Sequence, residues 1–225
     1  MLLFVAADPR ECAGLLSHWQ AVHPIQLPVN WARAGRWKGR EVMAIANGAG
    51  SDRAFAAILV APKPSAICNI GFCGALDEKL GIGDVFVANA IHNGEHVYET
   101  LVPSGKQGGG SVASVDHVVR GSAEKRNLRA VGASIVEMEA AGVARAAEDL
   151  ALPFYCIRAV SDLAGEDLQN DFNAALMPDG RFSVLRLVVG AFANPVQRFG
   201  ELIRLQQRTA LAAKKLGDFL ADCSF

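Results

Sequence analysis

Carboxylate side chains stand in the sequence at points where a catalytic acid or base could operate. Asp162 follows Ser161 at the end of an apolar run, residues 154–160, and it precedes Ala164 and Gly165. A carboxyl group that is half-buried at the end of a strand has a raised pKa, so it can serve as a general acid. The same position also suits a residue that caps the next turn, and the residues alone leave both roles open.

Three glutamates could likewise have either a structural or a functional role. Glu11 lies in the first helical turn expected after the strand Leu2–Ala6, and Glu137 and Glu139 flank Met138 where a strand meets a helix. Acidic residues are common in first helical turns because the helix dipole favours them there. One glutamate of the pair 137 and 139 could instead point into a binding site. Because the sequence does not separate the two roles, all three glutamates are candidate site residues.

Two glycine-rich segments are candidates for binding through backbone groups. The segment Gly71-Phe72-Cys73-Gly74 is expected to form a tight turn after the buried strand 66–70, where its N–H groups could bind an anion or a hydroxyl group. It could equally be a plain turn. A second segment, residues 47–51, opens a helix that Ser51 should cap. It lacks the third glycine of a dinucleotide-binding fingerprint and follows a hairpin, so no nicotinamide cofactor is expected.

The composition favours a compact protein that acts on a small-molecule substrate. The chain has 225 residues, of which 51% are hydrophobic, and a net charge of −1, which suits a single domain over residues 1–225. Because basic residues are not in excess, no nucleic-acid partner is expected, and no apolar stretch approaches the ~18 residues of a membrane span. Five cysteines with scattered spacing indicate a reducing, cytoplasmic environment. No cysteine or histidine pair has the spacing of zinc ligands, so no metal is expected.

Apolar runs predict an alternation of strands and helices that would position these residues. The expected strands are Leu2–Ala6, Trp31–Trp37, 41–46, 66–70, 84–90, 96–102, 134–136 and 154–160. The expected helices run to about Gln20 after Pro9, over 52–61, 138–150 and 181–192, and onward from Pro195. Such alternation predicts a mostly parallel sheet with helices on both faces, which binds ligands at the carboxyl ends of its strands. Glu11, segment 71–74 and Asp162 should meet there.

Four motifs follow one another along the chain in a familiar order. They are Asn69-Ile70-Gly71-Phe72-Cys73-Gly74-Ala75-Leu76, Gly81-Ile82-Gly83-Asp84-Val85, Val136-Glu137-Met138-Glu139-Ala140-Ala141 and the run from Pro153 to Asp162. Together they resemble the superfamily of purine nucleoside phosphorylases and 5′-methylthioadenosine/S-adenosylhomocysteine nucleosidases, over most of residues 1–165. The resemblance implies a three-layer αβα sandwich around a mixed, twisted central β-sheet. It also implies cleavage of the N-glycosidic bond of a purine nucleoside, with adenine the expected base, that bears a 5′ substituent.

The resemblance further implies roles for individual residues. Asp162 matches the acid that protonates or hydrogen-bonds purine N7, with Ser161 orienting it. Glu139 matches the carboxylate that holds the ribose hydroxyls, and Met138 matches the apolar floor beneath the sugar. Glu11 matches the base that activates water in the hydrolytic branch. These types suit the reaction, because an oxocarbenium-like sugar needs nearby negative charge and the departing base needs a proton.

The nucleophile of the reaction could be water or phosphate. Phosphorolytic relatives usually carry an arginine and a serine where this chain has Asn69 and Phe72, which argues against a phosphate site in that segment. Phosphate remains a possible co-substrate, since Arg10 and Arg53 could supply charge elsewhere. We expect water rather than phosphate, because Glu11 stands where the hydrolytic relatives place their base. No other cofactor is expected.

The base and 5′ pockets also depart from the nucleosidase pattern. Val118 stands where those enzymes have an aromatic residue stacking on the base, and Val119 matches the backbone group that reads the base. The stretch 84–137 is shorter than theirs. We therefore expect an open 5′ end that admits a bulky apolar substituent, with apolar residues at its rim.

The C-terminal part supports a narrower alternative. The segment from Leu176 to Arg181, and Asn194-Pro195 with the helix after it, resemble the hopanoid-associated phosphorylase subgroup. That subgroup is thought to remove adenine from adenosylhopane, so phosphorolysis of such a nucleoside is one alternative function. A non-catalytic nucleoside-binding protein is another. A small-molecule nucleoside is the expected partner, and a homodimer or other homo-oligomer is expected.

Overall fold

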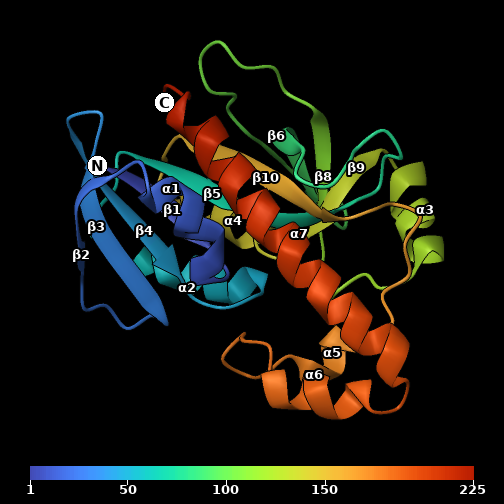
Figure 1. The fold of residues 1–225 in the computed structure, drawn as a ribbon. Coiled ribbons are helices and arrows are strands. Elements are labelled where there is room, and N and C mark those ends of the chain that lie inside the picture. The colour runs from blue at the N-terminus through green and yellow to red at the C-terminus, as the bar shows by residue number, and fades with distance from the viewer.

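A mixed ten-stranded β-sheet forms the centre of the computed structural model, which describes residues 1–225 (Figure 1). Its strands are β1 (Leu2–Ala6), β2 (Gln20–Pro24), β3 (Trp31–Trp37), β4 (Arg40–Ala46), β5 (Ala66–Ala75), β6 (Val85–Asn93), β7 (His96–Glu99), β8 (Gly110–Ser114), β9 (Ala133–Glu137) and β10 (Phe154–Asp162). Their spatial order is β10-β6-β8-β9-β5-β1-β4-β3-β2, with β7 paired to β6 outside this path. Parallel pairs, such as β1 with β5, occur beside antiparallel ones, such as β3 with β4. The predicted α/β class with a mixed central sheet is confirmed.

Helices cover both faces of the sheet (Figure 1). They are the 3₁₀ helix η1 (Pro9–Cys12) and the α-helices α1 (Ala13–Leu16), α2 (Ser51–Leu59), α3 (Ser122–Ala130), α4 (Ala140–Asp149), α5 (Phe172–Ala175), α6 (Val184–Ala191) and α7 (Pro195–Ala221). Alternate residues of β1 contribute to opposite faces of the sheet, because successive side chains of a strand point in opposite directions. Leu3 and Val5 belong to the apolar cluster that includes α2 and α4, whereas Phe4 and Ala6 belong to the cluster that includes α1 and α7. The sheet therefore lies between two helical layers, as the αβα sandwich predicts.

Strand β5 connects the two halves of the sheet. It pairs in parallel with β1 on one side and with β10 on the other, and its last two residues, Gly74 and Ala75, pair antiparallel with β9. Since β10 also pairs with β6, β6 with β8, and β8 with β9, five strands pair in a closed ring. This ring brings together the carboxyl ends of β5, β9 and β10, where the sequence placed its candidate residues.

The predicted glycine turn is instead part of a strand, so that prediction is wrong. Gly71-Phe72-Cys73-Gly74 belongs to β5, and Gly74 pairs with both Asp162 of β10 and Val136 of β9. A Cβ atom on Gly74 would lie 2.8 Å from Asp162 Oδ2 and 3.2 Å from a methyl group of Val136. The small residues therefore allow three strands to approach closely. In the sequence, small residues required by such packing cannot be distinguished from small residues of a turn.

Other predicted boundaries shift where local patterns were ambiguous. The first helix stops at Leu16, and Gln20 begins β2 instead of ending that helix. Gly50, with φ of +116°, is the N-cap of α2, and Ser51 is its first residue, so Ser51 is not the predicted cap. Strand β8 and helix α3 were not predicted, because the glycine-rich and charged segments that form them carry little apolar periodicity.

Helices α5 and α6 lie beyond the sheet, and α7 runs from them back across it (Figure 1). The predicted helix over 181–192 is α6, and the helix predicted from Pro195 is α7, which is 27 residues long. Only the second half of α7 contributes to the core on the sheet, through Ala212, Leu216 and Leu220. Its first half contacts α6, which in turn contacts α5. No helix has the length and apolar character that crossing a membrane requires.

Candidate active site

A cavity of about 450 Å³ lies where the carboxyl ends of β1, β5, β9 and β10 meet the C-terminal helices. Most predicted site residues line it, namely Arg10, Glu11, Phe72, Cys73, Val118, Val119, Glu137, Met138, Glu139, Ser161 and Asp162. Gly71 does not line the cavity, but a Cβ atom on it would lie 2.8 Å from Glu11 Oε1. The structure thus brings together carboxyl groups that are separated by up to 151 positions in the chain, from Glu11 to Asp162.

Glu11 is held by backbone N–H groups from two segments. Its Oε2 accepts hydrogen bonds from Ala7 N at 2.8 Å and Asp8 N at 3.0 Å, and its Oε1 accepts one from Phe72 N at 2.9 Å. The bond from Asp8 N belongs to a capping box at the start of η1, so Glu11 also has the structural role that its position suggested. Burial raises the pKa of Glu11, against the opposing effect of Arg158. A fixed carboxylate with a raised pKa can accept a proton from water.

Arg158 lies at the centre of a buried cluster that the sequence analysis did not identify. It projects from the middle of β10, is fully buried, and donates to the carboxylate of Glu137, to Asn69 Oδ1 and, at 3.4 Å, to Glu139 Oε2. Asn69 is therefore a partner of this arginine. A buried arginine requires several acceptors, and here β5, β9 and the start of α4 supply them.

The structure divides the two glutamates around Met138 between two tasks. Glu137 Oε2 accepts from Glu139 N at 2.8 Å and Ala140 N at 2.9 Å, so it holds the start of α4. Glu139 reaches across to Gly50 N at 3.2 Å, in the loop before α2. Burial, with the charge of Glu137 next in effect, raises the pKa of Glu139 to about 8. Positive charge in the cavity would favour the ionised form of Glu139.

Asp162 lies at the end of β10 with a donor on each carboxyl oxygen. Ser161 Oγ lies 3.0 Å from Oδ1, and Lys125 Nζ lies 2.5 Å from Oδ2. Burial raises the pKa of Asp162, and the ammonium group of Lys125 opposes that shift. Asp162 is not the cap of a following turn, which was the alternative that its sequence position left open.

The segment 117–119 lines the cavity together with an unpredicted pair of aromatic residues. The backbone N–H and C=O of Val118 are both bonded to the side-chain amide of Asn173, at 2.7 and 3.0 Å. The neighbouring Phe172 lines the cavity with Phe182, and their ring centroids are 6.0 Å apart. Aromatic faces are therefore present in the cavity, although Val118 does not provide one.

The two arginines considered for phosphate lie in different surroundings. Arg10 lines the cavity and forms a bidentate pair with Asp8, with Nε 2.8 Å from Oδ1 and Nη2 2.9 Å from Oδ2. Arg53 lies outside the lining and donates to the carbonyl oxygens of Asn47 at 2.6 Å and Pro178 at 3.2 Å. The structure thus does not bring these arginines together, and Arg53 fastens the 178–180 loop to the glycine loop before α2.

An apolar wall closes one side of the cavity. It consists of Val184, Leu187 and Val188 from α6 and Leu202 and Leu205 from α7. The short stretch 84–137 contributes to the lining only at residues 117–119, 136 and 137. The wall therefore comes from the C-terminal region. Val184 remains 73% exposed, so the wall continues onto the surface, as expected for an apolar rim.

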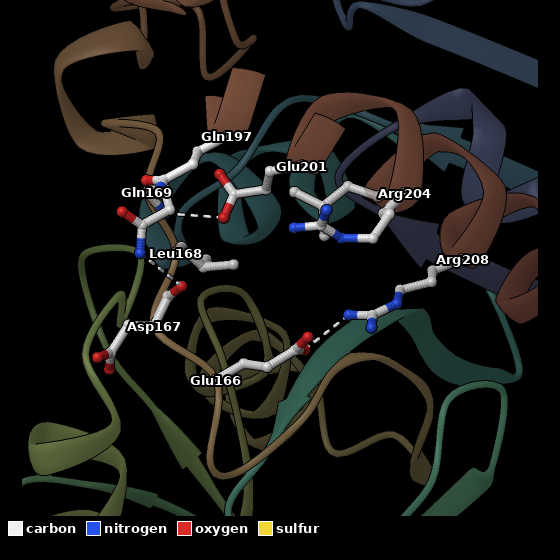
Figure 2. A pocket seen from close by; sticks show the side chains of 9 residues that line it. Glu166, Asp167, Leu168, Gln169, Gln197, Glu201, Arg204 and Arg208 are labelled. Carbon is white, nitrogen blue, oxygen red and sulfur yellow. Dashed lines mark hydrogen bonds and ion pairs between the residues drawn. The ribbon is translucent and has the colours of Figure 1, made fainter. Parts of the chain in front are cut away.

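A second, polar cavity of about 290 Å³ adjoins this wall. Figure 2 shows the ion pair of Arg208 with Glu166 and the bond from Gln169 to Glu201 that lie along it. Leu168 and Leu205 line both cavities. The buried Glu201 is saturated by Gln169 and Asn170, so it serves to hold the 166–170 loop against α7.

Cys73 is the one cysteine on the wall of the main cavity. Burial raises the pKa of Cys73 well above the usual thiol value, so its thiolate is disfavoured. No group of three or more His, Cys, Asp or Glu side chains is arranged to hold a metal ion.

Some of the functional residues that the sequence did not predict carry a recognisable sequence signal, and others carry none. Arg158 is a charged residue inside the apolar run of β10, and such a residue signals a buried partner. Lys125 is one of several charged residues in α3, and nothing in the sequence distinguishes it. Phe172 and Phe182 follow the strand-rich part of the chain, where no resemblance identified base-binding residues.

Comparisons with known proteins identify relatives of this chain. The family model described as the phosphorylase superfamily matches residues 2–108 and 106–180. A 5′-methylthioadenosine/S-adenosylhomocysteine nucleosidase of Staphylococcus aureus (strain JH9) is 28% identical over 176 residues, covering 63% of this chain and 77% of the relative.

Solved structures show the same fold along nearly the whole chain. The Streptococcus pneumoniae MTA/SAH nucleosidase in complex with 8-aminoadenine has a TM-score of 0.72 and 21% identity, covering 98% of this chain and 96% of that one. The Helicobacter pylori nucleosidase with butyl-thio-DADMe-Immucillin-A has a TM-score of 0.71 and 19% identity, covering 97% and 95%. Because the family model alone spans well over half of the chain, the protein belongs to the phosphorylase superfamily.

Proposed function

We propose that this protein cleaves the N-glycosidic bond of an adenine nucleoside that carries an apolar 5′ substituent. The observation that carries the proposal is that one cavity contains the buried Glu11 and Glu139 together with Asp162, whose side chain is 13% exposed, and that all three are fixed by hydrogen bonds. The relatives support the choice of adenine nucleosides, since they are named as methylthioadenosine and adenosylhomocysteine nucleosidases. A non-catalytic nucleoside-binding protein would have no need of this acid and base together.

Asp162 activates the leaving base in this proposal. We place the purine against its carboxyl group, in the cavity that Cys73, Val119 and Phe172 also line. As the bond from ribose C1′ to purine N9 breaks, its electron pair moves to the base, and a proton at N7 neutralises it. A positioned acid provides typically ~10²–10⁴-fold in rate for such a step.

Glu139 and Met138 hold the sugar. Glu139 accepts hydrogen bonds from the ribose hydroxyls, and Met138 lies beneath the ring. The sugar becomes cationic as the base departs, and negative charge fixed in a site of low polarity stabilises that cation. Arg158 and Glu137 maintain the position of Glu139 from below, because they are themselves buried and bonded to each other.

Glu11 activates the nucleophile, and water is the nucleophile that the residues favour. The side chain of Asn69 is bonded to Val5 O at 3.0 Å and to Arg158, and Phe72 offers no polar group, so neither side chain can bind phosphate. Arg10, paired with Asp8, is the one arginine on the cavity wall. The proposed reaction requires no cofactor beyond the nucleophile.

Product analysis tests this proposal directly. The protein would be incubated with 5′-alkylthioadenosines in phosphate-free buffer and in phosphate buffer, and adenine and the sugar product would be measured. Adenine with the free sugar in both buffers is the expected result. A sugar 1-phosphate formed only with phosphate would establish phosphorolysis, and binding without any release of adenine would establish a nucleoside-binding protein.

The apolar wall favours a bulky 5′ group, and it supports a second candidate substrate, a nucleoside with a large hydrocarbon at the 5′ position. Leu187, Val188 and Leu202 offer no partner for the charged amino-acid tail of an adenosylhomocysteine-like substrate. A nucleoside with a large hydrocarbon at the 5′ position, such as adenosylhopane, would be in keeping with this wall. A homo-oligomer remains a prediction, which sedimentation measurements can test.

A further inference from the structure

We propose that Lys125 is the source of the proton that Asp162 passes to the leaving base, so that the two residues act as one acid. The proposal rests on the proposed cleavage of an adenine nucleoside. Lys125 would be a positioning and proton-supplying residue that acts through Asp162.

The burial of Lys125 is the first observation. It is the one buried residue of α3, with 1% of its surface exposed, although α3 is otherwise a polar surface helix. An ammonium group is rarely buried unless it is paired, because it loses its hydration. Leu128, on the same helix, already contributes to the apolar contact with β9, so packing alone does not require a lysine at position 125.

The contacts of Lys125 are the second observation. Its Nζ lies 2.5 Å from Asp162 Oδ2 and 2.7 Å from the carbonyl oxygen of Leu163. The acceptors are the last residue of β10 and the residue that follows it, so the lysine points at the candidate acid and is paired with no other carboxylate. The ammonium group on one oxygen and the hydroxyl group of Ser161 on the other both favour the anionic form of Asp162, and in that form the proton for the base must come from Nζ.

The charged surroundings leave Lys125 as the available proton source. The ionisable and polar groups around the pair are Ser161, Glu166 and Asp167 next to β10, Cys73 on β5 and Arg208 on α7. Arg208 is paired with Glu166 at 2.6 Å and does not release its proton at ordinary pH. Lys125 is the one cation within hydrogen-bond distance of Asp162.

The proton balance is simple. Before reaction the pair consists of an ammonium and a carboxylate, with a net charge of zero. The proton moves from Nζ to the carboxyl group and from there to purine N7 as the bond to C1′ breaks. Lys125 is left as a neutral amine, which burial tolerates well, and Asp162 is again a carboxylate. The site has then gained one negative charge at the moment the sugar becomes positive, and water reprotonates the amine after the base has left.

The pH dependence of Lys125→Met separates this role from a structural one. In wild type the proton can reside on the ammonium group of Lys125 or on the carboxyl group of Asp162, whereas in the variant only the carboxyl group can hold it. We expect the variant to be within about 3-fold of wild type near pH 5 and at least ~10²-fold slower near pH 9. A ratio that stays constant with pH would overturn the proposal.

A substrate that needs no proton provides the control. An N7-methylated adenine nucleoside releases its base without protonation, so Lys125→Met should act on it at nearly the wild-type rate at every pH. A second variant, Lys125→Ala, should regain activity on the ordinary substrate with added ethylamine but not with propanol. Rescue by both compounds, or by neither, would contradict proton supply.

The wild-type protein gives an answer even if both variants fail to fold. Activity on the ordinary nucleoside should persist to at least about pH 9. A loss between pH 6 and 8 that spares the N7-methylated substrate would show that Asp162 acts alone. The proposed function fails separately, if wild type releases adenine from no nucleoside or if Asp162→Asn leaves the rate unchanged.

Discussion

At the scale of single residues, the site concentrates carboxyl groups around one guanidinium group. Arg158 contacts both Glu137 and Glu139, and its charge also acts on Glu11. One positive charge therefore faces three carboxyl groups in a buried space. A site of this kind is ready for a cation, which is what a ribosyl group becomes while its base departs. The proposed chemistry thus accounts for an arrangement that folding alone would not favour.

Asp162→Asn should remove the activity and preserve the fold. The amide has the same shape but cannot transfer a proton to N7, so we expect kcat to fall by ~10²–10⁴-fold. Adenine release is the measurement, and circular dichroism with nucleoside binding is the control. An activity within a few-fold of wild type would exclude Asp162 as the acid. An N7-methylated substrate should be nearly insensitive to the change.

Glu139→Gln should weaken both substrate binding and turnover, because Glu139 is proposed to hold the ribose hydroxyls while charge develops. We expect a loss in kcat/KM of at least ~10-fold, since hydrogen bonds to a charged group contribute about 1.5–3 kcal/mol. A 2′-deoxynucleoside lacks one of these hydroxyls and should lose less. Equal losses for the two substrates would contradict contact between Glu139 and the 2′-hydroxyl.

At the scale of elements, sequence patterns predicted the strands better than the connections. The buried strands β1, β5 and β10 are apolar runs with candidate residues at their ends, so both the strands and the meeting point of Glu11 and Asp162 could be predicted. Residues 71–74 could not be assigned correctly, because small residues occur both in turns and where strands approach closely. The ion pair of Lys125 depends on how α3 packs on β9, and no local pattern encodes that contact.

Helix α6 should determine which 5′ groups the protein accepts. Leu187 lines the cavity, so Leu187→Asp should raise KM for a 5′-alkylthioadenosine by at least ~10-fold and should change KM for adenosine much less. The matched control is Val189→Asp, on the same helix, at a residue that is 60% exposed and outside the lining. Equal effects of the two variants would show that α6 does not form the 5′ pocket.

We also expect wild type to discriminate weakly among 5′-alkylthio groups of increasing size. A strong preference for 5′-methylthioadenosine over longer alkyl analogues would contradict this expectation.

At the scale of the whole molecule, the active site is a cost to stability that the rest of the fold must offset. Two apolar clusters of 26 and 18 buried residues lie on the two faces of the sheet, and they supply most of the apolar burial. The carboxyl groups at the ends of β1, β9 and β10 instead lose hydration on folding. Burial raises the pKa values of Glu11, Glu139 and Asp162, so all three favour the folded state more at low pH than at high pH.

This linkage predicts a pH-dependent gain in stability for Glu139→Gln. The pKa of Glu139 is raised from 4.5 to about 8 on folding. Between these values the unfolded chain releases the proton and the folded chain retains it, so the contribution of Glu139 to stability is lost as pH rises through this window. Glutamine has no proton to lose, and the melting temperature of the variant relative to wild type should therefore increase from pH 5 to pH 8. For a chain of this size a gain of about 1 kcal/mol corresponds to roughly 2–4 °C, which calorimetry at the two pH values can resolve. A difference in melting temperature that is equal at both pH values would show that Glu139 titrates in the folded protein as it does in the unfolded chain.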